Sequence, residues 1–445
     1  MPIMKPPSSI ERPALPRGAI RRLADPVRQF LAIESVSGIV LIVCTVIALV
    51  LASSPLERPV HDFWTTPVQF GIAGWTLKLT LHNVVNDGLM ALFFFVVGLE
   101  IKRELVAGEL STPQKAALPV VAALGGMIAP AGIYLALQGG QPGERGWGVP
   151  MATDIAFVVG VLALFGKRVP FGLKVFLLSL AIADDVGAIL VIAVAYSGSP
   201  DWFALGLAAI GLLVCYLLNR LGVRSILLYF ALGLGIWFAM LNSGIHPTIA
   251  GVLLGLLTPA TAWVGQATLK AALSSALGRV TAGTANAHDF EHLADAVREA
   301  TSPLERLQTA LHSWVGYAIM PLFALANAGV PIRVEGMQNP VGLAIVCGLV
   351  IGKPLGILGF SYLAVKLGIA KLPTGVNWKL IAAAGCLGGI GFTMSLFIAE
   401  LAFADAAMLD AGKFGILLGS VISAGSGSLF LAFGLRGSES GRRRL

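Results

Sequence analysis

Apolar segments of about twenty residues recur along this 445-residue chain, and they constrain its fold more than any other feature. A bilayer offers no water to backbone groups, so a segment of about 20 apolar residues crosses it as a helix that satisfies its own hydrogen bonds. Hydrophobic residues make up 56% of the chain and charged residues 12%, whereas an average soluble domain carries about 25% charged residues. The sequence therefore predicts an all-α polytopic membrane protein and not a soluble enzyme.

Twelve spans are expected, at about 33–53, 83–99, 116–137, 147 onward, 172–196, 203–219, 225–241, 245–262, 313–330, 341–366, 379–401 and 411–435. They form one transmembrane domain over residues 31–435, between basic tails at 1–30 and 436–445. Polar residues fill 263–303, which predicts a cytoplasmic loop. Residues 65–81 alternate apolar and polar around Ala73-Gly74, which predicts a β-hairpin. Because an isolated hairpin is marginally stable in water, this one is expected to pair with another segment, a second protomer being one candidate.

The basic residues indicate the orientation and exclude a nucleic-acid-binding protein. With twelve spans and a cytoplasmic N-terminus, the outer segments contain five basic residues, namely Arg58, Lys78, Arg145, Arg333 and Lys413. Lys353 lies within a span, and the other 25 of the 31 Lys and Arg are cytoplasmic. This asymmetry is the positive-inside pattern, so the net charge of +7 is explained by membrane insertion and both termini are predicted to be cytoplasmic.

Two adjacent carboxylates, Asp184 and Asp185, lie in the middle of the fifth span. An ionised acid at a helix centre costs roughly 2.5–3.5 kcal/mol on insertion scales. Adjacent helical positions point about 100° apart, so both side chains cannot pack against one neighbouring helix. The pair is predicted to line a polar cavity inside the protein. The alternative is a pair of buried acids that are neutralised by cations and have no further role.

Two more ionisable residues lie deep in spans, Asp154 in the fourth and Lys353 in the tenth. Lys353 can neutralise one aspartate, either as part of the ion site or as a plain structural ion pair, and Pro354 should bend the helix there. Gly and Pro interrupt the fourth span at 148–154 and the eleventh at 385–395. Interruptions at corresponding places in two halves point to an ion site in a secondary transporter. Spans 3–5 and 10–12 would then be inverted repeats, with Thr153 able to offer an oxygen to a cation; close helix packing is the alternative explanation for the glycines.

Several motifs together resemble the NhaA family of sodium/proton antiporters, in unbroken order over about residues 33–435. These motifs are Phe94–Glu104, Ser243–Thr248, Ala152–Phe157, Ile182–Ile189, Gly352–Gly356 and Gly389–Ser395. The resemblance implies crossed broken spans 4 and 11 and a Na⁺ site at Asp184 and Asp185. It also implies that Lys353 pairs with Asp184, that Asp154 compensates the crossed helix ends, and that the β-hairpin mediates a homodimer in the bacterial inner membrane.

The family's pH-responsive cluster maps onto Glu100, Arg103 and Glu104. The match weakens before the ninth span, where Gln308 and Thr309 replace an acid and a histidine of well-known members, while His312 remains. The family's pH set point is therefore not carried over to this chain.

Competition between ions for the same oxygens would drive transport. Carboxylates suit a small, hard cation, and they also bind protons. A site that holds either Na⁺ (or Li⁺) or protons exchanges one for the other by facing the two sides alternately. Two acids and a lysine allow more than one proton per Na⁺, so exchange is expected to be electrogenic, with no cofactor.

Three other classes of protein are alternatives to a sodium/proton antiporter. A sodium-coupled solute symporter on a similar fold is the main alternative. An intramembrane aspartyl protease lacks its Gly-x-Gly-Asp signature here, because Ala-Ile-Ala precedes Asp184. A channel would show a flux too fast for alternating access.

Overall fold

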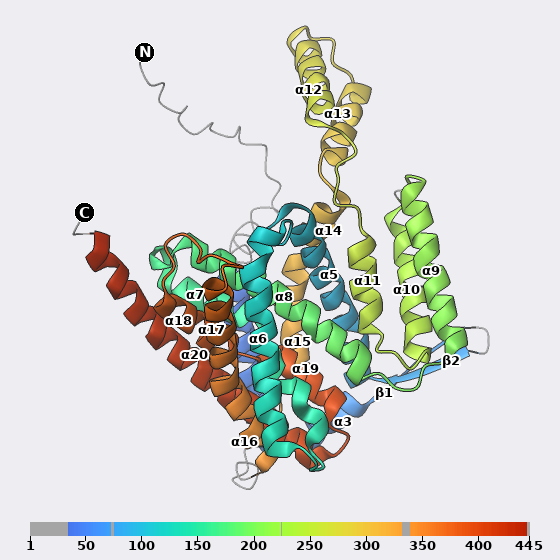
Figure 1. The fold of residues 1–445 in the computed structure, drawn as a ribbon. Helices are drawn as coiled ribbons and strands as arrows, with labels where there is room; N and C mark the ends of the chain where they lie inside the picture. Colours follow the sequence, from blue (N-terminus) through green and yellow to red (C-terminus); the bar gives the residue numbers. More distant parts are fainter. Residues whose placement is uncertain (1–33, 73–74, 224, 332–338, 443–445) are drawn as a thin grey trace.

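The computed structural model describes residues 34–442 except 73–74, 224 and 332–338, and the predicted N-terminal tail at 1–30 lies outside the described residues (Figure 1). The first half of the chain contains α2 (Glu34–Ala52), α3 (Glu57–Thr65), β1 (Pro67–Ile72), β2 (Trp75–Thr80), α4 (Leu81–Asn83), η1 (Val84–Leu89), α5 (Met90–Ala107), α6 (Pro113–Gln138), η2 (Glu144–Met151), α7 (Ile155–Phe165), η3 (Gly166–Arg168), α8 (Phe171–Ala195), α9 (Trp202–Arg220) and α10 (Ile226–Asn242). The second half contains α11 (Thr248–Leu257), α12 (Gln266–Thr281), α13 (Ala287–Glu299), α14 (Pro303–Trp314), η4 (Val315–Ile319), α15 (Met320–Asn327), α16 (Pro340–Cys347), η6 (Gly348–Gly352), α17 (Lys353–Lys366), α18 (Trp378–Gly388), α19 (Phe392–Ala402) and α20 (Ala406–Arg442).

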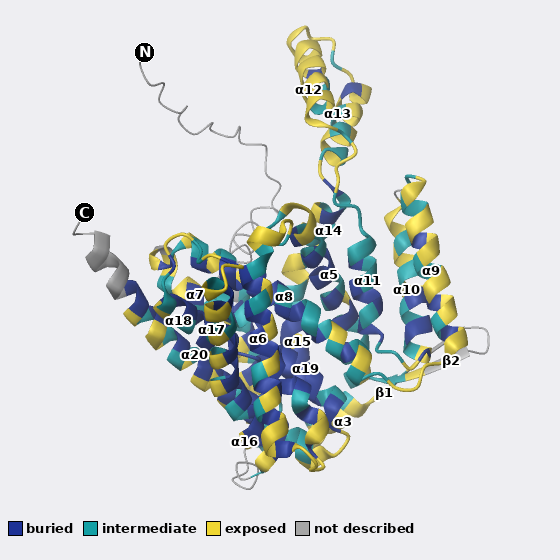
Figure 2. Ribbon diagram, viewed as in Figure 1, coloured by how far each residue is buried: buried dark blue, intermediate teal, exposed yellow. Residues whose placement is uncertain are grey.

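The helices confirm a multi-pass membrane protein. Within the described residues, 8 helical stretches are long and apolar enough to cross a membrane, and the number is 10 if each of two bent pairs counts as one span. The bent pairs are α2 with α3, at 114°, and α18 with α19, at 45°. Two shorter apolar helices, α10 and α11, complete the set. Many large apolar side chains on the outer faces are exposed, as expected where lipid is the solvent (Figure 2).

Two expected spans differ in length from the sequence prediction. The second extends from Leu81 to Ala107, because neither Gly nor Pro stops the helix at the charged residues after Gly98 and the first break comes at Gly108. The eighth is shortened to α11. Pro247 precedes its first turn, and Pro259 keeps Thr258 in an extended conformation at ψ 133°.

The contacts between helices divide the bundle into two groups. We call one the site group; its members α6, η2, α7, α8, α16, η6, α17, α18, α19 and α20 contact one another. We call the other the hairpin group; it contains α2, α4, η1, α5, α9, α10, α11, α14, η4 and α15. The groups meet where α5 contacts α8, where α2 contacts α7 and where α15 contacts α19.

The predicted β-hairpin is present at one end of the bundle (Figure 1). Strands β1 and β2 pair antiparallel, with Val68 opposite Leu79 and Ile72 opposite Trp75. Its turn, at 73–74, lies outside the described residues. The hairpin leads directly into α4, so it is continuous with the hairpin group.

The prediction of a loop at 263–303 is wrong, because this segment contains the two helices α12 and α13, which pack against each other and project from the opposite end of the bundle (Figure 1). Asn286 and Asp289 form a capping box at the start of α13. Arg279 forms an ion pair with Asp289 and so joins the two helices. The polar composition indicated exposure correctly, but the capping box was the better guide to structure.

Glycines bring α6 and α17 into close contact beside Lys353. A Cβ at Gly356 would collide with the carbonyl oxygen of Gly125, whereas a Cβ at Gly359, on the same helix, would meet no described atom within 4 Å outside the backbone of its own helix. We therefore expect Gly356→Val to lower the melting temperature by several degrees, because overpacking costs about 1–3 kcal/mol. Gly359→Val, the matched control, should melt close to the wild type. Equal melting temperatures for both variants, measured in detergent by fluorescence, would contradict this packing.

Candidate functional site

The two adjacent aspartates lie halfway along α8 and are both buried. Asp184 is 3% exposed and Asp185 is 6% exposed. The Oδ2 of Asp184 lies 2.7 Å from the Nζ of Lys353, while its Oδ1 has no hydrogen-bond partner. Asp185 forms no hydrogen bond or ion pair with any residue that the structure describes. The adjacent acids therefore differ, because one has a cation and the other has none.

Lys353 begins α17 and is 1% exposed. Its ammonium group donates to Asp184 and also to the hydroxyl of Thr153, at 2.8 Å. The Thr153 hydroxyl in turn donates to the carbonyl oxygen of Gly388, at 2.8 Å. The helix before Lys353 widens into a π-turn, η6, next to Pro354, where a bend is predicted from the sequence. Since Pro354 has no N–H, the regular α-helical bonding pattern cannot continue there.

Both predicted helix interruptions are present, and Asp154 joins them. Residues 152–154 are extended between η2 and α7, and a break separates α18 from α19. Asp154 caps α7, since its Oδ1 accepts from Ala156 N at 3.0 Å and Phe157 N at 3.3 Å. Its Oδ2 accepts from the backbone N–H of Thr393, at 3.1 Å, and from the Thr393 hydroxyl. One carboxylate therefore faces the positive N-terminal ends of two half-helices.

Thr393 is a site residue that the sequence reasoning did not single out. It is fully buried and lies in the first turn of α19. The crossing is also fixed by the backbone, because Asp154 N donates to the carbonyl oxygen of Ile390 at 2.7 Å. The sequence did offer one signal, a threonine hydroxyl four residues after Gly389 in the eleventh-span interruption. It indicates a partner for Asp154 only once the two interruptions are known to cross.

The residues predicted to respond to pH lie together, near the C-terminal end of α5 and on the neighbouring α14. Arg103 contacts Glu104 at 3.6 Å and donates to the Oε1 of Gln308 at 3.3 Å. Glu100 lies within electrostatic range of Arg103 and of His312 on α14. Glu100 is also within electrostatic range of Asp185. Glu100 thus interacts electrostatically both with this cluster and with the aspartate pair.

Together these residues place hard oxygen ligands, a buried cation and two helix ends in one small region. An anionic carboxylate that has no partner favours either a proton or a small cation, because a buried bare charge is costly. The hydroxyl of Thr153, which contacts Lys353, and the free oxygen of Asp184 are further oxygen ligands in this arrangement. Oxygen ligands of this kind suit hard cations.

Comparison with known proteins agrees with this chemistry. The family model described as Na+/H+ antiporter 1 matches residues 28–431. Na(+)/H(+) antiporter NhaA 2 of Acidiphilium cryptum (strain JF-5) is 51% identical over 422 residues, which cover 94% of both chains. The NhaA protein of Rhizobium meliloti (strain 1021) is 50% identical and covers 94% of this chain and 96% of its own. NhaA 2 of Vibrio vulnificus (strain CMCP6) is 44% identical over 96% of both chains.

Similarity of this extent over nearly the whole chain does not favour the symporter alternative. It agrees with the family resemblance inferred from the sequence motifs. The chain belongs to the NhaA family of Na⁺/H⁺ antiporters.

Proposed function

We propose that this protein exchanges Na⁺ or Li⁺ for protons at Asp184 and Asp185 by alternating access, and so serves sodium and pH homeostasis. The observation that supports this most is the asymmetry of the pair: Asp184 is held by Lys353, whereas Asp185 is buried without a partner among the described residues. Na⁺ or a proton can neutralise Asp185, and the two exclude each other there. The exchange is tested in everted membrane vesicles, where Na⁺ added to a preformed pH gradient should release protons.

Lys353 makes more than one proton per cation available. When Na⁺ takes the oxygens of Asp184 as well as Asp185, the ammonium group loses its ion-pair partner and its proton becomes easier to release. Thr153 is placed to exchange its contact with the lysine for a contact with the cation. Two protons leaving as one Na⁺ enters would make transport electrogenic and driven by the membrane potential. Asp154 would stay in place as the charge between the two helix ends.

We further propose that the chain has twelve spans and that both termini are cytoplasmic. The ten spans counted with the bent pairs, together with α10 and α11, support this number. The crossing of the interrupted helices at Asp154 supports inverted repeats of spans 3–5 and 10–12. In this orientation the β-hairpin lies outside and the α12–α13 helical hairpin lies in the cytoplasm. The exposed apolar faces would contact the lipid of a bacterial inner membrane.

The hairpin is the proposed dimer contact. Within the described residues the two strands form a sheet with two free edges, and a second copy can pair with one of them. We expect replacement of residues 67–80 by a short Gly/Ser linker to convert the dimer into a monomer in detergent, measured by light scattering, while Na⁺ still raises the melting temperature. A dimer that persists without the hairpin would place the interface elsewhere.

The pH dependence should arise mainly from competition at the aspartate pair. Gln308 and Thr309 do not titrate near neutral pH, so Glu100, Glu104 and His312 are the groups left for local sensing. If Na⁺ and protons compete directly, raising Na⁺ from millimolar to saturating levels should shift the activity profile steadily toward acid. The measurement is exchange rate against pH at several Na⁺ concentrations, with Gln308→Glu and His312→Ala as comparison variants. A profile that stays fixed as Na⁺ rises, but moves in those variants, would show a separate sensor.

A further inference from the structure

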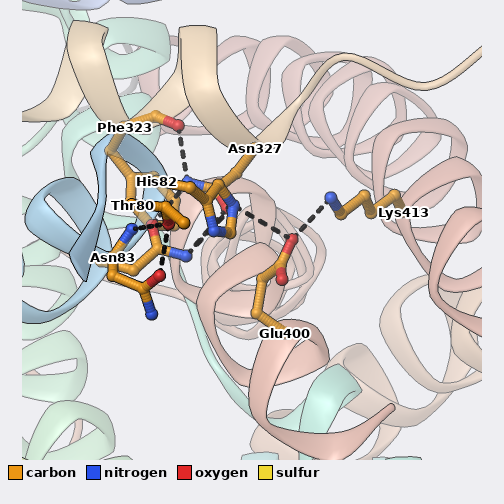
Figure 3. A network of polar contacts seen from close by, with 8 residues as sticks. Thr80, His82, Asn83, Phe323, Asn327, Glu400 and Lys413 are labelled. Carbon is orange, nitrogen blue, oxygen red and sulfur yellow. Dashed lines mark hydrogen bonds and ion pairs between the residues drawn. The ribbon is translucent and has the colours of Figure 1, made fainter. Parts of the chain in front are cut away.

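A second pair of buried charges lies at the end of the bundle that carries the β-hairpin. Glu400, near the end of α19, has its Oε1 2.6 Å from the Nζ of Lys413, near the start of α20 (Figure 3). The two side chains are 14% and 9% exposed. Taking two charges out of water is costly even when they pair, and among the described residues neither charge forms a hydrogen bond or ion pair with the aspartate site. The pair therefore carries a desolvation cost that the ion site does not explain.

Glu400 also faces a histidine across the bundle. Its Oε1 lies 3.9 Å from the Nε2 of His82 on α4 (Figure 3). The same ring nitrogen of His82 lies 3.0 Å from the Oδ1 of Asn327 and 3.4 Å from the Nδ2 of Asn86. Asn327 is fully buried and is itself bonded to Asn86 and to the carbonyl oxygen of Phe323. Asn327 and Asn86 therefore hold the imidazole in place independently of Glu400.

The contact between His82 and Glu400 joins the two groups of helices. His82, Asn86 and Asn327 belong to the hairpin group, in α4, η1 and α15. Glu400 and Lys413 belong to the site group, in α19 and α20. The same half-helix α19 begins at the crossing, where Thr393 bonds Asp154. Glu400 follows seven residues later, about 10 Å along the helix axis, so one rigid element connects the ion site to this contact.

We propose that Glu400 is a latch that closes the hairpin side of the protein by holding α19 against His82. In alternating access one group of helices moves against the other, so a contact that bridges the groups at one end must open when that side opens. Lys413 provides a partner for Glu400 when the latch is open. When His82 separates, Glu400 keeps Lys413 as its partner, and no buried carboxylate is left unpaired. The latch rests on the proposed exchange by alternating access.

A reversible cross-link tests whether the latch must open. In a variant whose four native cysteines are replaced, His82→Cys with Glu400→Cys is bridged by a cleavable bifunctional thiol reagent in vesicles. Cross-linking should reduce Na⁺/H⁺ exchange at least about tenfold, because one of the two states is no longer populated, and reduction should restore it. The matched control is Glu57→Cys with His61→Cys, the same residue types four positions apart on α3, where the same bridge should leave exchange unchanged. Full exchange with the His82–Glu400 bridge in place would overturn the proposal.

A second measurement does not depend on the cysteine variant folding well. His82→Gln removes the imidazole from Glu400 and retains an amide that can bond Asn327. Weakening a latch on one side shifts the population toward the state open there, so the KM for Na⁺ should fall at least about twofold on the hairpin side and rise on the other. Right-side-out and everted membrane vesicles give the KM for Na⁺ on the two sides of the protein. A merely structural defect would move both in the same direction, and that result would also overturn the latch.

The two proposals fail in different ways. If the aspartate pair is not the ion site, Na⁺ will raise the melting temperature of Asp185→Asn as much as that of the wild-type protein, before any cross-linking. If only the latch is wrong, Na⁺ will raise the melting temperature and exchange will continue through the cross-link. Retained Na⁺ stabilisation in the cross-linked protein, together with lost exchange, is the result that the latch predicts.

Discussion

Asp185→Asn is expected to abolish Na⁺/H⁺ exchange while leaving expression and folding intact. The substitution removes an anionic oxygen without a change in volume, and Asp185 has no ion-pair partner among the described residues that would be left behind. Loss of the charge at this position removes both the affinity for Na⁺ and the group that would take the proton in its place. Exchange in everted vesicles should fall to the level of membranes without the protein.

The matched control for this variant is Asp62→Asn, an exposed aspartate on α3. It carries the same chemical change on the surface and should exchange at the wild-type rate. Full exchange in Asp185→Asn would remove the ion site from this pair. Loss of exchange in both variants would indicate a defect in expression or insertion, which the amount of protein in the membrane would show.

Asp184→Asn is expected to stop exchange and also to destabilise the protein strongly. Lys353 is 1% exposed and its ion pair with Asp184 measures 2.7 Å. Removing one partner of a buried pair costs about 3–5 kcal/mol, because it leaves an uncompensated charge. Asp185→Asn leaves that ion pair intact. In the absence of Na⁺ at neutral pH, Asp184→Asn should therefore melt lower than Asp185→Asn.

A second substitution separates charge from packing in this variant. If the penalty comes from the orphaned ammonium group, Lys353→Met added to Asp184→Asn should recover part of the lost melting temperature, because the buried charge is then absent. Thermal unfolding followed in detergent gives the order of the three variants. The reverse order of the single variants would mean that another acid compensates Lys353, with Asp154 the next candidate.

Local patterns were sufficient to predict the elements that carry the site. The apolar run around Asp184 and Asp185, the Gly and Pro breaks beside Asp154 and the alternation at 65–81 each report on a single segment, and the structure has the corresponding helices and strands. The loop at 263–303 was predicted wrongly because polar composition was given more weight than the Asn286–Asp289 capping box.

Contacts between distant segments were not predictable in the same way. Lys413 was counted among the basic residues of the outer segments, yet the residue as a whole is 7% exposed and pairs with Glu400. Nothing in the local sequence of α20 indicates this burial, because it depends on how α19 and α20 pack. The contact of His82 with Glu400 joins positions more than three hundred residues apart, and no spacing rule relates them.

Counting the protons released when Na⁺ binds tests the central claim most directly. The purified protein is titrated with Na⁺ in weakly buffered solution near neutral pH, and calorimetry in buffers of different ionisation enthalpy gives the protons released per Na⁺ bound. If Na⁺ and protons compete for Asp184 and Asp185, the wild-type protein should release at least one proton per Na⁺, and Asp185→Asn should neither bind Na⁺ nor release protons. Saturable Na⁺ binding without proton release, or unchanged release in Asp185→Asn, would contradict exchange at this pair.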